Sequence, residues 1–148
     1  MCDTAAMTDP LTDALTELFH EHALTALYVF GSRAPEVAAR VAGEIRLAEH
    51  PGSDVDIGVL PARAGGLSSK ARVRLAQQLE SMLVVDRVDL VVLPEAEAFL
   101  AADVVRGELL TATDLDAEAE AQLYYLRRAA DLAPYLREQW REKVGTEL

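Results

Sequence analysis

Two aspartates at alternating positions of one apolar run constrain this chain more than any other feature. Asp54 and Asp56 begin a run that predicts a β-strand over 54–60, and Asp89 lies inside a second such run, 87–93. Side chains two positions apart on a strand share one face, so Asp54 and Asp56 point the same way, about 7 Å apart. If the strand carrying Asp89 is their neighbour, about 4.8 Å away, the three carboxylates meet. Carboxylates that close repel each other unless a cation lies between them. Two divalent ions about 3.5–4 Å apart are the usual arrangement in phosphoryl and nucleotidyl transfer.

The apolar surroundings of these acids favour a functional role over an ordinary surface role. An unpaired charge at Asp56 would be costly there, so this residue requires a metal, a partner group or water. Asp54 follows a proline and a glycine and could by itself be a simple turn residue. Asp86, close to Asp89, is interpreted as a turn residue that pairs with Arg87. Asp89 is therefore the preferred third carboxylate.

A glycine and a serine, Gly31-Ser32, follow a short apolar run that predicts a strand over 26–30. Glycine lets the backbone approach an anion closely, while free N–H groups and the serine hydroxyl supply hydrogen-bond donors for a triphosphate. Alone, this pair is common in loops, so the prediction depends on the acids. The planar fork of Arg33 could contact a phosphate or could lie on the surface.

The rest of the pattern predicts an α/β (α+β) sandwich in which helices pack on a small mixed sheet. By length we expect a single domain, 1–148, with about 1–8 flexible and 108–143 as a C-terminal helical region. The expected segments are a helix opening at Asp9-Pro10, strand 26–30, one modest helix within 34–51, strand 54–60, helix 68–83, strand 87–93, helical residues 95–106, an extended piece 108–112 and a long helix 114–143 containing Pro134.

Composition narrows the possible partners and the location. A net charge of −11 argues against direct binding to nucleic acid, because phosphates attract basic surfaces. The acidity suits a basic protein partner, or it only keeps a small domain soluble. The only cysteine, Cys2, cannot form an internal disulfide, and no apolar stretch approaches the roughly 18 residues of a membrane span. We therefore expect a cytoplasmic chain without membrane contact. A basic cluster, Lys70, Arg72 and Arg74, is expected to be a solvated face.

Taken together, Gly31-Ser32, Asp54-Val55-Asp56 and Asp89 resemble the signature of the polymerase-β-like nucleotidyltransferase superfamily. Two C-terminal stretches, 106–110 and 124–136, are similar to the helical region of one group within it. This group is the minimal nucleotidyltransferases (MNT), the antitoxins of HEPN–MNT toxin–antitoxin pairs. The acids identify only the superfamily, whereas the C-terminal stretches and the short length favour the antitoxins.

The resemblance implies an activity and a set of ligands. ATP would be the substrate, with two Mg²⁺ ions held by Asp54, Asp56 and Asp89. The stretch Gly31-Ser32-Arg33 would bind the nucleotide, and Asp89 would also take a proton from the attacking hydroxyl. AMP would pass to a hydroxyl, expected to be a tyrosine's, of a cognate HEPN RNase toxin, within a hetero-oligomer of toxin and antitoxin.

Two other functions stay open at this point. The chain could neutralise a toxin by masking it without catalysis, or it could modify a small molecule, as aminoglycoside nucleotidyltransferases do. One departure from the antitoxin pattern is the gap between Ser32 and Asp54, which is longer here and includes Pro35-Glu36. In the last helix, Tyr124 and Tyr125 are expected to pack and Trp140 to anchor the helix.

Overall fold

The computed structural model describes residues 10–44 and 52–147 of the chain. Two sets of expectations lie outside the described residues. The flexible start and the helix cap at Asp9 fall in 1–9, and the end of the segment before the second strand falls in 45–51. Within the described residues, no helix is both long enough and apolar enough to cross a bilayer.

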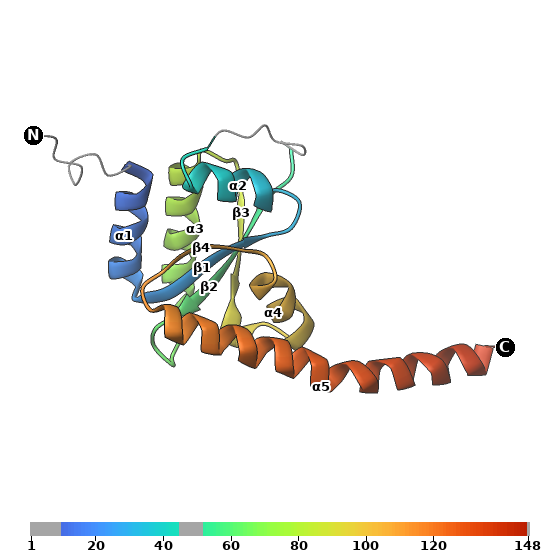
Figure 1. Ribbon diagram of the computed structural model, residues 1–148. Coiled ribbons are helices and arrows are strands. Elements are labelled where there is room, and N and C mark those ends of the chain that lie inside the picture. Colours follow the sequence, from blue (N-terminus) through green and yellow to red (C-terminus); the bar gives the residue numbers. More distant parts are fainter. Residues whose placement is uncertain (1–9, 45–51, 148) are drawn as a thin grey trace, which may run out of the picture.

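Helices and strands alternate along most of the chain (Figure 1). In order they are α1 (Pro10–His22), β1 (Leu24–Phe30), α2 (Ala34–Val41), β2 (Val55–Pro61), α3 (Ser69–Leu83), β3 (Val88–Val92), the 3₁₀ turn η2 (Leu93–Glu95), α4 (Ala98–Val105), β4 (Glu108–Ala112) and α5 (Leu115–Glu147). The expected α/β sandwich with a long last helix is confirmed.

The four strands form one mixed sheet in the order β3-β2-β1-β4. The central strand β1 runs antiparallel to both β2 and β4, whereas β2 and β3 are parallel and are connected through α3. Phe30, at the end of β1, lies opposite Asp56 on β2, and Asp56 lies opposite Asp89 on β3. Leu24 and Pro61 pair at the other end of the sheet.

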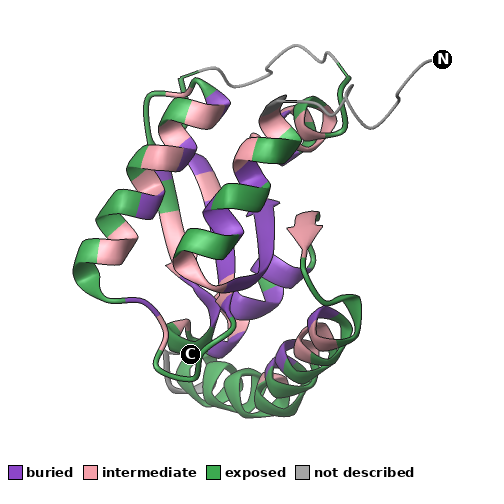
Figure 2. Ribbon diagram, turned by 90° about the vertical axis from the view of Figure 1, so that its left-hand side faces the viewer, coloured by how far each residue is buried: buried purple, intermediate pink, exposed green. Residues whose placement is uncertain are grey.

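Helices cover both faces of the sheet, so the central strand is buried on both sides (Figure 2). The alternation of side chains along β1 separates two cores. On one side Leu27 and Val29 join the residues of α1, α2 and α3. On the other side Ala26 and Tyr28 meet α4 and Tyr125 of α5. Apolar surface is thereby removed from water on both faces, which is the dominant stabilising contribution to such a fold.

Local signals explain where α3 begins and ends. The hydroxyl of Ser68 accepts a hydrogen bond from the N–H of Ala71 at 3.1 Å, a standard N-cap. Leu75, Leu79 and Leu83 repeat at four-residue spacing and are fully buried, which fixes the face that packs on the sheet. Val84 then ends the helix in a left-handed conformation, with φ of +53°.

The last helix, α5, is held to the body by its first half only. The hydroxyl of Tyr28 donates a 2.6 Å hydrogen bond to Oε1 of Glu118, and both side chains are buried. Tyr125 and Ala129 are also buried, whereas Trp140 is 68% exposed and its half of the helix protrudes from the body (Figure 1). The expected anchoring by Trp140 is therefore wrong, because the second half of α5 extends beyond the surface on which the first half packs.

Candidate active site

Strand alternation brings the three predicted carboxylates to one end of the sheet. On β2, Ile57 and Val59 fill the core beneath α1–α3, so Asp56 points to the opposite face, the one that α4 covers. Asp54 immediately precedes β2 and lies two positions before Asp56, so the alternation places it on the same face as Asp56. On β3, Val88 and Val92 pack in the core beneath α1–α3. Asp89 follows Val88 directly, so strand alternation places it on the opposite face, toward α4. The parallel register pairs Asp56 directly with Asp89.

Gly31, at the end of β1, leaves room for one of these carboxylates. Its φ is +80°, a conformation that side chains other than glycine rarely adopt. A Cβ built on this glycine would clash with Oδ2 of Asp56. The close approach therefore requires glycine for two reasons, and it places backbone directly against the carboxylate. Gly31 and Ser32 are both exposed, so this backbone is accessible to a ligand.

The electrostatics of the site are unfavourable without a cation. Burial raises the pKa of Asp56 above its ordinary value, and the negative charges of Asp89 and Asp54 raise it further. Asp54 and Asp89 are more open, with 43% and 49% of their side-chain surface exposed. Ionisation of the half-buried Asp56 beside the two more accessible carboxylates is therefore unfavourable. A bound cation would remove that penalty.

The donor set fits Mg²⁺, although the described residues do not form a closed cage. In the described parts of the chain, no group of three or more Asp, Glu, His or Cys side chains is arranged so that it could hold a metal ion by itself. Mg²⁺ is usually held by only one or two carboxylates together with water and substrate phosphates. Three carboxylates at an open end of the sheet, beside the glycine that makes room for Asp56, provide oxygen ligands and leave space for such phosphates.

Similarity to known proteins agrees with this geometry. The family described as "Polymerase beta, Nucleotidyltransferase" matches residues 13–116. The chain belongs to this family. The matched range includes the predicted carboxylates and the Gly31-Ser32 turn, and it ends at the start of α5. Among curated proteins, no sequence match was found.

Solved structures extend the similarity over more than nine-tenths of this nucleotidyltransferase. A toxin–antitoxin crystallised with AMP-PNP is 28% identical, with a TM-score of 0.58, covering 91% of this chain and 95% of that chain. A chain from the solved complex of a tri-AMPylated Shewanella oneidensis HEPN toxin with an MNT antitoxin is 27% identical, with a TM-score of 0.56 and coverages of 93% and 94%. A mutant toxin–antitoxin MntA-HpeT gives 27% identity, a TM-score of 0.61 and coverages of 91% and 95%.

Arg33, the residue predicted either to bind phosphate or to lie on the surface, is engaged within the protein. Its Nη1 donates to the carbonyl oxygen of Ser53 at 3.0 Å, and its Nε donates to the carboxylate of Glu36. These contacts tie the start of α2 to the residue just before Asp54. Arg33 thus connects the glycine turn with the strand that carries the acids, which is a positioning contact in this state.

Arg87 is the residue at the site that the sequence did not predict. Its Nε lies 3.7 Å from Oδ2 of Asp54 and 3.7 Å from Oδ1 of Asp89. The expected pairing of Arg87 with Asp86 is replaced by these two contacts. Because Arg87 directly precedes β3, two residues before Asp89, strand alternation could have suggested that both lie on one face.

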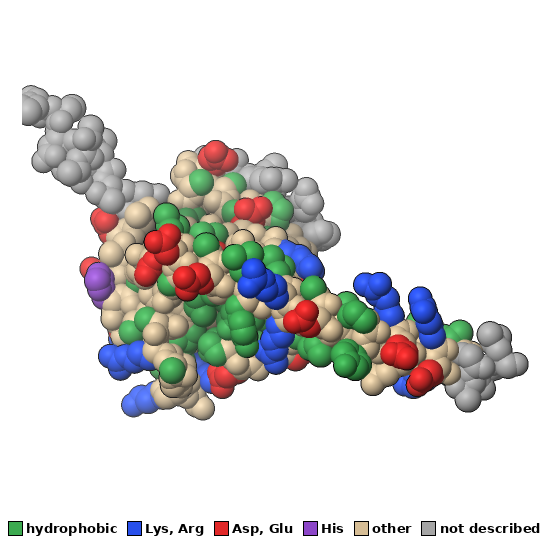
Figure 3. Space-filling model, turned by 60° about the horizontal axis from the view of Figure 1, so that its bottom comes forward, with side chains coloured by type: hydrophobic (Ala, Val, Ile, Leu, Met, Phe, Trp, Pro, Cys, Tyr) green, Lys and Arg blue, Asp and Glu red, His purple; other side chains and the backbone are tan. Residues whose placement is uncertain are grey.

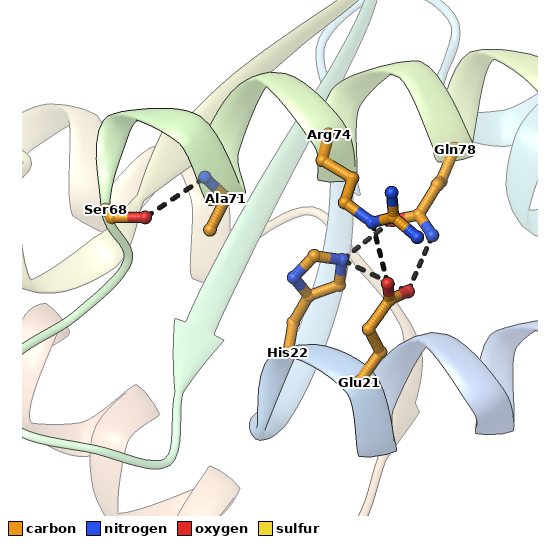
Figure 4. A network of polar contacts seen from close by, with 6 residues as sticks. All are labelled: Glu21, His22, Ser68, Ala71, Arg74 and Gln78. Atoms are coloured by element: carbon orange, nitrogen blue, oxygen red, sulfur yellow. Dashed lines mark hydrogen bonds and ion pairs between the residues drawn. The ribbon is translucent and has the colours of Figure 1, made fainter.

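His22 and the basic cluster of α3 lie at the other end of the sheet. Figure 4 shows His22 and Glu21 of α1 facing Arg74 and Gln78 of α3. Nε2 of His22 lies 2.7 Å from Oε1 of Gln78, and hydrogen bonds from Gln78 and Arg74 lower the pKa of Glu21. This network joins two helices near the Leu24–Pro61 pair, so it is remote from the carboxylates.

The neighbouring Arg72 forms an ion pair with Glu95. Two members of the basic cluster are therefore paired with acids of other segments rather than directed at a triphosphate. The expectation of an exposed, mainly structural face agrees with these contacts.

Proposed function

We propose that this chain transfers AMP from ATP to a hydroxyl of a cognate HEPN toxin, expected to be a tyrosine's, and thereby neutralises the toxin. The observation that carries the proposal is the position of Asp56. This carboxylate lies between the glycine turn at Gly31 and the carboxylate of Asp89, at an open end of the sheet. A nucleotide held by the turn would have its phosphates directly beside the acids.

Each residue has a role that its surroundings support. Asp54 and Asp56 would hold Mg²⁺, which would supply Lewis-acid stabilisation to the phosphate under attack. Asp89 would also hold metal and would accept the proton of the attacking hydroxyl. As an accessible carboxylate it can meet a group brought by another protein. Gly31 and Ser32 offer N–H and hydroxyl donors to the triphosphate. The hydroxyl oxygen forms a bond to the α-phosphorus as the bond to pyrophosphate breaks.

The relatives support the choice of substrate and acceptor. One similar toxin–antitoxin was crystallised with AMP-PNP, an ATP analogue, and another contains a tri-AMPylated HEPN toxin bound to an MNT antitoxin. Adenylyl transfer to a protein is consistent with both. ATP is therefore the proposed donor, and the toxin is the proposed acceptor.

The protruding half of α5 is the surface that we propose contacts the toxin. Leu136 and Trp140 are 49% and 68% exposed, and hydrophobic side chains lie among both basic and acidic ones along this helix (Figure 3). Toxin–antitoxin chains of similar fold are crystallised as complexes, which supports the toxin as the occupant. Masking without catalysis is the second candidate function, and this exposed helix is the observation that favours it.

Intact mass spectrometry distinguishes the two functions. The purified chain would be incubated with the cognate toxin, ATP and Mg²⁺, and both proteins weighed. The proposal predicts one or more AMP additions on the toxin, absent with the Asp54→Ala/Asp56→Ala variant. A stable complex without any mass change on the toxin would reject transfer and leave masking.

A further inference from the structure

We propose that Arg87 is a place-holding cation of the carboxylate site, which neutralises Asp54 and Asp89 until a divalent metal ion displaces it. The inference rests on the proposed function, because it takes the three carboxylates to be the metal site. It adds a role for a residue outside the acids and the glycine turn. Arg87 acts by competing with the metal rather than by touching the reacting atoms.

The geometry of Arg87 is that of a bridging counter-ion. Its Nε is 3.7 Å from a carboxylate oxygen of Asp54 and 3.7 Å from one of Asp89. Its backbone is fixed at the start of β3, because its carbonyl oxygen accepts a 3.0 Å hydrogen bond from the N–H of Val55. The guanidinium therefore starts from a point between the strands that carry the two acids.

The same contacts are weak enough to be displaced. Both separations exceed the length of a direct charge-assisted hydrogen bond, about 2.7–2.9 Å. The side chain of Arg87 is 70% exposed, so it can turn into solvent with little loss of packing. Exposed ion pairs of this kind contribute little each to stability. A dication that binds the acids directly would therefore replace the guanidinium.

The site needs a cation in both states. Three carboxylates occupy neighbouring positions, with Asp56 opposite Asp89 in the register of β2 and β3, so their negative charges repel each other. Arginine keeps its charge throughout the physiological pH range, so Arg87 offsets this repulsion at every relevant pH. Its presence should lower the affinity for free Mg²⁺, because the metal has to replace a charge that is already there.

Metal titration of the full chain tests this competition without measuring catalysis. Mg²⁺ is titrated by isothermal titration calorimetry in the absence of nucleotide. Arg87→Gln should bind Mg²⁺ about threefold to tenfold more tightly than wild type, whereas Arg87→Lys, which keeps the charge, should change the affinity less than twofold. Arg63→Gln is the matched control, because Arg63 is an exposed arginine in the turn at the far end of β2.

Thermal unfolding provides a second measurement. With a chelator present, Arg87→Gln should have a lower Tm than wild type, and the difference should close as Mg²⁺ is added. Unchanged or weaker Mg²⁺ binding by Arg87→Gln would overturn the role of Arg87. If AMP transfer by wild type still occurs, that result rejects only this inference. Absence of both Mg²⁺ binding and AMP transfer in wild type would reject the proposed function as well.

Discussion

The carboxylate end of the sheet and the protruding half of α5 differ from their surroundings in opposite ways. At the ends of β2 and β3, acids interrupt strands whose other residues are mainly apolar, and burial raises the pKa of Asp56. In the last turns of α5, apolar side chains such as Trp140 lie exposed on a helix rich in charged residues. Packing within the chain explains neither arrangement. We propose that each is explained by a ligand from outside, a metal–nucleotide complex in the first case and a protein surface in the second.

Because the two regions have different proposed ligands, substitutions in one should not impair the function of the other. Substitutions at the carboxylates should stop transfer without weakening the complex with the toxin. Substitutions in the far half of α5 should weaken the complex without altering the site itself. Any residue that affects both would show that the two regions are coupled.

The largest effect is expected from Asp89→Asn. Loss of the proposed proton acceptor and metal ligand should lower the rate of AMP transfer at least about 100-fold, while the affinity for the toxin stays within about twofold. Transfer rates come from the mass of the toxin over time, and affinity from calorimetry. Asp86→Asn is the matched control and should remain active. Equal losses in both variants would contradict the choice of Asp89 over Asp86.

Trp140→Glu should have the next largest effect, on the opposite property. A large exposed aromatic side chain is typical of the few residues that dominate an interface, so its replacement should weaken toxin binding by about 10-fold to 100-fold. The free energy of unfolding should change by less than about 0.5 kcal/mol, because Trp140 is largely exposed on the protruding half of α5. Val73→Glu, an exposed apolar position on α3, serves as the control for added charge. Unchanged binding by Trp140→Glu would remove α5 from the interface.

Gly31→Ala separates backbone strain from loss of the site. Gly31 and Gly43 have similar φ values, +80° and +84°, but a Cβ at Gly43 has nothing within 4 Å, whereas one at Gly31 meets Asp56. Both alanine variants should lose about 1–2 kcal/mol of stability in urea denaturation, the cost of the left-handed conformation. Only Gly31→Ala should also lose binding of Mg²⁺ and ATP. Normal nucleotide binding by Gly31→Ala would contradict the proposed phosphate turn.

Tyr28→Phe tests how α5 is attached to the sheet. The variant removes the 2.6 Å hydrogen bond to Glu118, whose buried carboxylate would keep only the 3.2 Å contact from Gln122. Unfolding in urea should show a loss of about 1–3 kcal/mol. Tyr124→Phe, at an exposed position of α5, should be neutral. Equal stability of the two variants would mean that the buried pair does not hold α5.

The smallest expected effect is a gain in stability from Asp56→Asn, measured with a chelator present. Because burial and the neighbouring acids raise the folded-state pKa of Asp56, its contribution to stability is greatest in acid and is lost as the pH rises through that pKa. Above this pKa, the ionised side chain therefore destabilises the folded state, and replacement by asparagine removes that effect. The Tm of the variant should exceed that of wild type at pH 7. The difference in Tm should narrow as the pH is lowered toward the ordinary pKa range of carboxyl groups. A lower Tm at pH 7 would contradict the electrostatic picture.

Local sequence patterns were sufficient to predict most elements and the face that Asp54 and Asp56 share. Strand alternation is a short-range property, and the apolar runs of β2 and β3 carry it clearly. Boundaries were less accurate: helical residues expected over 95–106 are in fact η2 and the shorter α4, since Glu97 caps the helix by accepting from the N–H of Leu100.

Features that depend on long-range pairing could not be predicted. The register that sets Asp89 opposite Asp56 is fixed by contacts between strands far apart in the chain, and so is the position of β4 at the sheet edge. The contacts of Arg87 depend on that register. The sequence likewise predicted the long last helix, but not that the body ends before Trp140.

The central claim is that the carboxylate end of the sheet silences the toxin by covalent transfer. The most direct test is to react toxin and chain with ATP and Mg²⁺, separate the toxin under denaturing conditions, refold it, and measure its mass and its RNase activity. The account predicts a toxin that is heavier by AMP and stays inactive alone, and a toxin of unchanged mass and full activity after incubation with Asp54→Ala/Asp56→Ala. Full activity and unchanged mass after incubation with wild type would contradict it.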